Sequence, residues 1–152
     1  MIDVIYANAE TVTLTGSIVK TSLATVTIPG STLGKKGVLR VNLAYSHNLS
    51  AGNKTISVEI AGQSVFNDVQ STLSSSQSQT FRVRNRNNEK AQLVSNPSEF
   101  QNSTTGVNTT TTIDTTIPQQ LVVYGQLANG ADSLSLDALC VRYGIDRSHR
   151  TR

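Results

Sequence analysis

The chain has 152 residues, a formal net charge of +3 and a single cysteine, Cys140. This length is typical of one domain, one cysteine excludes an internal disulfide, and no stretch approaches the roughly 20 apolar residues of a membrane-spanning helix. Only 15% of the residues are charged and 5% aromatic, whereas Ser, Thr, Asn and Gln together make up roughly two-fifths of the chain. Threonine suits strands and the other three suit turns, so the composition is typical of a β protein with long polar loops.

The N-terminal residues 1–10 contain neither the basic region nor the apolar core of a signal peptide, so we expect a protein made and folded in a cytosol. They are expected to form an N-terminal arm or a first strand. From residue 11 onward, apolar and polar residues alternate in short segments, the pattern of strands with one buried face. These segments are residues 11–15, 23–28, 38–45, 56–60, 65–69, 81–86, 91–94, 121–124 and 134–141. Residues 71–79 and 101–112 are expected to be polar loops.

The clearest local signal is Asn129-Gly130, which lies between the apolar runs 121–124 and 134–141. Asn-Gly readily adopts the positive φ angles of a type I′ turn, so the dipeptide predicts a tight β-hairpin. In the second run, Leu134, Leu136, Ala138 and Cys140 recur at every second position and are expected to share the buried face. Cys140 is therefore interpreted as a small buried hydrophobe and not as a nucleophile.

No stretch of ten residues has the spacing of an amphipathic helix. The many short strands and polar turns predict an all-β fold, a jelly-roll-like antiparallel β-sandwich with extended terminal arms. Residues 11–143 would form the sandwich, flanked by the arm or first strand at 1–10 and by a basic C-terminal tail at 144–152. The order of the strands cannot be read from the sequence.

The residues that usually carry chemistry are few and scattered. The two histidines, His47 and His149, have no nearby partners at the spacing of a zinc site, and we expect no metal and no cofactor. Asp132 and Asp137 could be imagined as a pair of acids, but we interpret them as surface or turn carboxylates. With no glycine-rich phosphate loop either, we expect a protein that is not an enzyme.

Two arginine clusters remain as candidate protein-binding elements. Arginines in residues 81–86 alternate with apolar residues and would share one strand face, either as a solvated surface or as a contact with a neighbouring subunit. Arginines in the tail would be held by an acidic protein surface or, as a second choice, by nucleic acid. The candidate residues are Arg82, Arg84, Arg86, Arg142, Arg147, Arg150 and Arg152.

Four stretches together resemble a known family. They are TVTIPGSTLGKKGVLRV at 25–41, NKTISVEIAG at 53–62, FRVRNRNNEKAQ at 81–92 and IDTTIPQQLVVYGQLANGADSLSLDALCVR at 113–142. In these stretches the chain resembles the jelly-roll module of tailed-bacteriophage virions, found in capsid decoration (cement) proteins and in head- and tail-fibre domains. Residues 1–10 and the basic tail have no counterpart in this pattern.

The resemblance implies a virion structural protein on the capsid surface, with no catalytic residues, that forms a homotrimer and binds the major capsid protein. Because the module makes up most of these 152 residues, whereas a tail fibre usually embeds it in a much longer chain, a free-standing decoration protein is favoured over a fibre. The alternatives are a receptor- or glycan-binding head- or tail-fibre module and a nucleic-acid-binding β domain that uses the arginine clusters. We expect neither nucleic acid nor a membrane as a partner.

Overall fold

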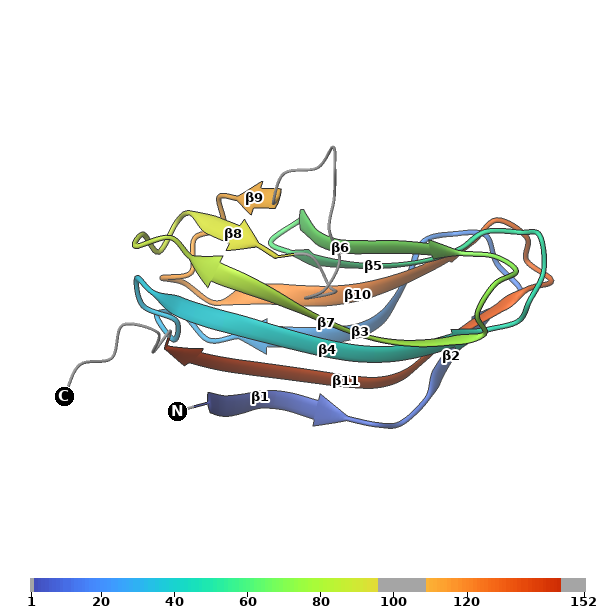
Figure 1. Ribbon diagram of the computed structural model, residues 1–152, viewed down its shortest axis with the longest axis horizontal. Helices are drawn as coiled ribbons and strands as arrows, with labels where there is room; N and C mark the ends of the chain where they lie inside the picture. The colour runs from blue at the N-terminus through green and yellow to red at the C-terminus, as the bar shows by residue number, and fades with distance from the viewer. Residues whose placement is uncertain (1, 96–108, 146–152) are drawn as a thin grey trace.

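The computed structural model describes residues 2–95 and 109–145, and Figure 1 shows strands running along the long axis of the molecule. The described residues form strands and connecting loops without a helix. In chain order the strands are β1 (Ile2–Asn8), β2 (Val12–Thr15), β3 (Thr21–Ile28), β4 (Gly37–His47), β5 (Lys54–Ile60), β6 (Gln63–Gln70), β7 (Ser76–Asn85), β8 (Gln92–Val94), β9 (Thr109–Thr111), β10 (Gln119–Leu127) and β11 (Ser133–Ile145).

The strands form two antiparallel sheets, named here the large sheet and the small sheet. The large sheet has the order β1-β11-β4-β7-β8-β9, with β2 also paired to β11, and the small sheet has the order β3-β10-β5-β6. The chain crosses between the sheets after β2, β3, β4, β6, β9 and β10. In the large sheet β11 lies between β2 and β4, and in the small sheet β10 lies between β3 and β5, as in a jelly roll built from two Greek keys. The predicted all-β, jelly-roll-like sandwich is confirmed.

The inward faces of the two sheets enclose one hydrophobic core. Strand β4 shows why the sequence folds this way, because its odd-numbered residues from Leu39 to Tyr45 are all buried and its even-numbered residues are not. Aromatic rings join the two layers: Phe66 of the small sheet stacks on Phe81 of the large sheet with ring centroids 5.2 Å apart, and Tyr45 meets the edge of Phe66. The Tyr45 hydroxyl donates to Asp68, so its polar end is satisfied inside the sandwich.

A β-bulge in β11 overturns the predicted alternation of the second apolar run. The register of β11 against β4 shifts between Leu136 and Ala138, which leaves Asp137 as an extra residue in the strand. Leu134 and Leu136 face the core as expected, but after the bulge the buried residues are Leu139 and Val141. Cys140 is therefore half-buried on the outer face, and its interpretation as a buried hydrophobe is wrong. An extra residue shifts the period-two alternation by one, and composition does not reveal where it sits.

The predicted hairpin at Asn129-Gly130 is also wrong. Strands β10 and β11 belong to different sheets, and neither Asn129 nor Gly130 is among the residues with positive φ. The turn there is held by Asp132 N–H donating to the carbonyl of Asn129 and by Ala131 N–H donating to its side chain. A two-residue hairpin with positive φ at both positions does occur, at Ala61-Gly62 between β5 and β6.

Two segments that were expected to be loops contribute strands. Strand β7 begins at Ser76 within the predicted loop 71–79, and it pairs with β4 from Ser46↔Ser76 onward. Thr109–Thr111 form β9 against β8, within the predicted loop 101–112. Residues 101–108 lie outside the described part. Residues 76–80 of β7 and the three residues of β9 lack an apolar alternation. Pairing with the edge of a neighbouring strand therefore specifies them, which the sequence pattern does not show.

The loops at one end of the sandwich are tied together by a buried polar network (right-hand side of Figure 1). The Lys54 ammonium, 1% exposed, donates to the carbonyls of Ser50 and Ser71 and to the Ser50 hydroxyl. Ser50 and Asn48 in turn donate to one carboxylate oxygen of Asp132. Asp132 is interpreted from the sequence as a surface or turn carboxylate. It lies in the turn between β10 and β11, but it is only 5% exposed and links this turn to the β4–β5 loop. The network thereby joins three connections that are far apart in the sequence.

Replacing Lys54 with Met should destabilise the fold by about 1–3 kcal/mol, because it leaves the carbonyls of Ser50 and Ser71 without this donor and removes the positive charge near the Asp132 carboxylate. Urea denaturation measures the free energy of unfolding. Lys36→Met, at an exposed turn position, is the matched control and should change stability by less than about 0.5 kcal/mol. Equal stabilities for the two variants would contradict this role of Lys54.

Asp132 also makes stability depend on pH on the acid side. Hydrogen bonds from Asn48 and Ser50 hold the pKa of Asp132 below its usual value of 3.8. A carboxyl group whose pKa is lower in the folded state stabilises the fold above its unfolded-state pKa and loses this contribution as the pH falls through the folded-state value. Asp132→Asn should therefore be less stable at pH 7, and its stability should fall less steeply below about pH 4. Thermal melts from pH 7 to pH 2.5 measure this. An equally steep loss of stability at low pH in the variant and in the wild type would contradict it.

Candidate functional site

The predicted arginine cluster on residues 81–86 is only partly brought together. Arg82 and Arg84 alternate with the buried Phe81 and Val83 and lie on the outer face of β7. Arg86 lies beyond the end of β7, in the exposed turn that leads to β8. Of the tail candidates, the structure describes Arg142, which is exposed on β11. Arg147, Arg150 and Arg152 lie outside the described residues.

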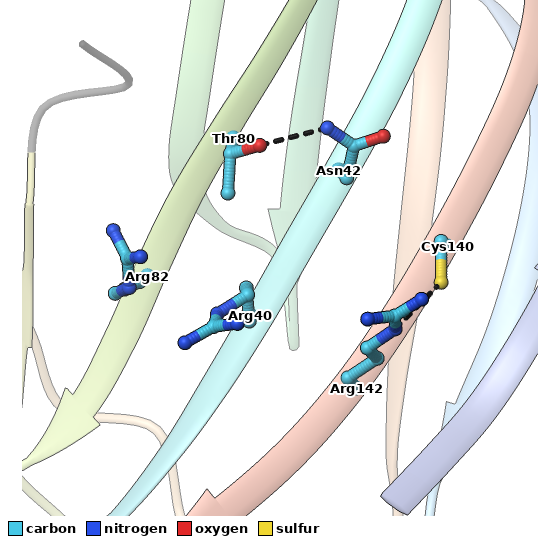
Figure 2. Close-up of a pocket in the computed structure, with 6 residues that line it drawn as sticks. All are labelled: Arg40, Asn42, Thr80, Arg82, Cys140 and Arg142. Atoms are coloured by element: carbon cyan, nitrogen blue, oxygen red, sulfur yellow. Dashed lines mark hydrogen bonds between the residues drawn. The ribbon is translucent and has the colours of Figure 1, made fainter. Parts of the chain in front are cut away.

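The large sheet instead assembles a different set, an arginine row made of Arg82, Arg40 and Arg142. Arg40 pairs with Arg82 across β4 and β7, and it pairs with Arg142 across β4 and β11. Neighbouring strands lie about 4.8 Å apart, so the three residues line up across the sheet within about 10 Å. Figure 2 shows the three side chains projecting from adjacent strands on the same face.

Arg40 is absent from the candidates predicted from sequence. Its strand carries a single arginine and shows no cluster, and only the pairing of β4 with both neighbours places it between Arg82 and Arg142. Arg142 reaches the same face because of the bulge at Asp137. Without the extra residue, the alternation that buries Leu134 and Leu136 would turn Arg142 toward the core.

The arginine row borders a depression of about 420 Å³ on the outer face of the large sheet. The depression is lined by Arg40, Asn42, Thr80, Arg82, Cys140 and Arg142 (Figure 2). Cys140, Asn42 and Thr80 form the next cross-strand row, two residues along each strand from the arginines. Their side chains are short whereas arginines are long, so the hollow follows from the order of residue sizes along the three strands.

Hydrogen bonds fix the floor of the depression. The Asn42 amide donates to the Thr80 hydroxyl over 2.7 Å and to the carbonyl of Gln79, which orients its oxygen away from β7. The Arg142 Nε donates to the Cys140 sulfur over 3.3 Å, which holds that guanidinium along its own strand. No carboxylate is among the six lining residues. Three planar guanidinium groups beside neutral donors form a site suited to carboxylates or other oxyanions.

The other polar groups do not assemble into a site of this kind. Within residues 2–95 and 109–145, no group of three or more His, Cys, Asp or Glu side chains could hold a metal ion. His47, at the end of β4, has its Nδ1 hydrogen-bonded to the Asn48 carbonyl. Asp137, at the bulge, accepts from the Thr11 hydroxyl, whereas Asp132 is held by Asn48 and Ser50. No helix in the described residues is long and apolar enough to span a membrane.

Comparisons with known proteins give low similarities. No family model matches the chain, and no curated protein matches it. Among solved structures, the dimeric latent PorU from Porphyromonas gingivalis has a TM-score of 0.44 at 14% identity, over 93% of this chain and 13% of that one. The insecticidal delta-endotoxin Cry8Ea1 from Bacillus thuringiensis has a TM-score of 0.40 at 11% identity, over 80% of this chain and 18% of that one.

A third similar structure is the infectious bursal disease virus VP2 subviral particle, with a TM-score of 0.36 at 10% identity over 99% of this chain and 44% of that one. The chain thus spans less than half the length of each of these three proteins. Similarity at this level says nothing about what the chain binds or does.

Replacing Arg40 with Gln should stabilise the isolated protein by about 0.2–1 kcal/mol at low ionic strength, because it removes the middle one of three adjacent like charges. The gain should shrink in 0.5 M salt as the charges are screened. Thermal or urea unfolding measures the change in stability. The control is Lys36→Gln, which also removes one positive charge but at an exposed turn. A loss of stability at low salt would show that packing of the arginine stem outweighs the repulsion.

Proposed function

We propose that this chain is a non-enzymatic virion structural protein, a capsid decoration or cement protein that binds the outside of a phage capsid and stabilises it. The observation that carries the proposal is the arginine row, an array of three outward-facing guanidinium groups on the large sheet. The resemblance of four stretches to the jelly-roll module of phage virions supports it, and the confirmed jelly-roll topology agrees with that resemblance. The partner would be the major capsid protein, and the chain would act as a homotrimer at the capsid surface.

The physical basis of such a function is mass action. A protein that binds assembled shells but not free subunits shifts the equilibrium toward the shell. A trimer that contacts several subunits at once gains further avidity, by a factor of about 10²–10⁴ without any new kind of contact. Strong single contacts are then unnecessary, and a modest charged surface on each copy suffices.

The alternative of a receptor- or glycan-binding fibre module has less support from the aromatic side chains, which commonly stack on sugars. Tyr45, Phe66 and Phe81 are buried between the sheets. The ring of Tyr124 is covered by the Lys20 ammonium, 4.5 Å from its centroid. Binding of the purified protein to a glycan array would favour this alternative.

The proposal predicts that the purified chain co-sediments with assembled shells of the virus that encodes it and not with unassembled capsid subunits. Truncation after Ile145, which keeps β11 and removes Arg147, Arg150 and Arg152, should weaken shell binding while leaving the melting temperature unchanged. Electron microscopy of decorated shells would locate the bound copies. Absence of co-sedimentation by the full chain would overturn the proposal, and unchanged binding by the truncated chain would remove the tail from it.

A further inference from the structure

Four connecting loops lie side by side at one end of the sandwich, and together they are named here the loop end (right-hand side of Figure 1). They are residues 16–20 between β2 and β3, 48–53 between β4 and β5, 71–75 between β6 and β7, and 128–132 between β10 and β11. Each loop connects strands that hold matching places in the orders β2-β11-β4-β7 and β3-β10-β5-β6. Across the loop end, the order is therefore β2–β3, β10–β11, β4–β5 and β6–β7.

The tips of these loops are aliphatic. Eight large hydrophobic residues are exposed in the part of the chain that the structure describes, and four of them lie in the loop end, namely Ile18, Val19, Leu49 and Leu73. Their exposure ranges from 55% for Leu49 to 88% for Leu73, so the core does not cover them. Apolar patches on the order of a few hundred Å² mark interaction surfaces on soluble proteins.

The exposed part of the loop end has almost no free charge. The charged residues of the four loops are Lys20 and Asp132. Lys20 is paired with Glu59 and lies over the ring of Tyr124, whereas Asp132 is buried in the network with Asn48. The other loop residues are Gly, Ala, Ser, Thr, Asn and the four aliphatic residues, with no aromatic residue among them.

Hydrogen bonds between neighbouring loops hold the tips in place. Gly16 N–H donates to the carbonyl of Gly130 over 2.9 Å, which joins the β2–β3 loop to the β10–β11 loop. Ala128 N–H donates to the carbonyl of Asn53 over 2.9 Å, which joins the β10–β11 loop to the β4–β5 loop. The Lys54 ammonium then joins the β4–β5 and β6–β7 loops. Loops that are already fixed lose little conformational entropy when a partner binds.

The four aliphatic residues form two groups at opposite margins of the loop end. Ile18 and Val19 lie on the β2–β3 loop, whereas Leu49 and Leu73 lie on the adjacent β4–β5 and β6–β7 loops. The outermost loops are separated by three strand spacings of about 4.8 Å, or roughly 14 Å. Groups this far apart can contact two different neighbours at the same time.

We propose that the loop end is the surface through which copies of this chain associate, with Ile18 and Val19 of one copy packed against Leu49 and Leu73 of the next. The contact joins two different patches, and its repetition around a three-fold axis closes a ring of three copies. The inference rests on the proposed function, from which it takes the trimer, and it adds the surface that forms this trimer.

Composition and charge favour a second copy as the occupant over a different protein. Interfaces between identical subunits are more apolar than interfaces of transient complexes, and their cores are depleted of charged residues. The chain has a net charge of +3, so two copies repel one another least where neither exposes a free charge.

A lipid surface fits the loop end less well. Segments that lie in a membrane interface combine apolar residues with Trp or Tyr anchors and with Lys or Arg side chains that meet the headgroups. The four loops have no aromatic residue, and their single lysine is paired with Glu59.

The size of the patch predicts how tightly the copies bind. Two aliphatic side chains on each side bury much less than the roughly 800 Å² per partner of a standard interface, so one such contact is weak. Closure of the ring gives every copy two contacts, and both must break before a copy leaves. We therefore expect a trimer that dissociates on dilution.

Substitutions in one margin at a time test both the surface and the pairing of unlike patches. The variants are Ile18→Ser/Val19→Ser and Leu49→Ser/Leu73→Ser, and sedimentation velocity over a range of protein concentrations measures their mass. The wild type should form trimers, and in each variant the concentration for half-association should rise about tenfold or more. An equimolar mixture of the two variants should form dimers, because one intact contact remains between unlike copies.

The matched control is Val4→Ser/Ile117→Ser, which removes two aliphatic side chains of similar exposure from outside the loop end. It should form trimers like the wild type. The trimer fraction should not fall in about 0.5 M salt, because the contact does not depend on unscreened charge. Thermal melts of each variant establish that it is folded.

Four outcomes would overturn the inference. A monomeric wild type would exclude self-association, and trimers in both double variants would place the contact elsewhere. Dimers formed by either double variant alone would indicate that like patches pair. Binding of the wild type to phosphatidylcholine vesicles, lost in both variants, would assign the loop end to a lipid surface.

Shell binding separates this inference from the proposed function. If the full chain binds shells but is a monomer, or if the double variants stay trimeric and lose shell binding, the capsid function stands and the self-contact is wrong. If the copies associate through the loop end as expected but the trimer does not bind shells, the self-contact stands and the capsid function is wrong.

Discussion

The β-bulge at Asp137 is the constraint on which the outer surface of the molecule depends. Strand β11 pairs with β1, β2 and β4, so a change of phase within it affects both faces of the large sheet. One extra residue buries Leu139 and Val141 in the core and turns Cys140 and Arg142 outward. If β11 had no extra residue, Leu139 and Val141 would face outward and lose their burial. Full burial of one such aliphatic side chain contributes about 1.5–3 kcal/mol, so this loss would be large. The position of the arginine row is thus maintained by the packing of the core beneath it.

A second constraint acts at the loop end, where the sandwich buries a lysine and an aspartate. Lys54 and Asp132 are linked through the Ser50 hydroxyl, and the same network includes the carbonyl of Ser71. Buried charges are costly unless they are hydrogen-bonded. Lys54 donates three hydrogen bonds and Asp132 Oδ1 accepts two, so the network constrains the loops that supply these groups, whereas Asp132 Oδ2 has no hydrogen-bond partner among the described residues. The fit is close at Gly52, where a Cβ would lie 2.6 Å from a carboxylate oxygen of Asp132. The loops of a jelly roll can vary in sequence, but these are coupled to one another by the need to satisfy buried polar groups.

The fold and the proposed contact surface place different demands on the same strands. In β4, odd-numbered residues build the core and even-numbered residues from Arg40 to Ser46 form the outer face. Residues that pack the core and residues that form the surface therefore alternate along one strand. A row of three arginines lies outside the core, and adjacent like charges on neighbouring strands repel one another. The row is carried by this sequence and not by the jelly-roll fold as such.

The amino-acid sequence by itself determined the class of the fold, because period-two alternation in segments such as 38–45 and 56–60 directly reports a half-buried strand. It also identified Arg82 and Arg142 as candidate residues, since clustered arginines are visible without a structure. It could not locate the bulge at Asp137, the separation of β10 and β11 into different sheets, or the pairing of Arg40 with both neighbours. Those features depend on which strands lie side by side and in what register. Strand pairing is a contact between residues far apart in the chain, so only the tertiary structure decided it.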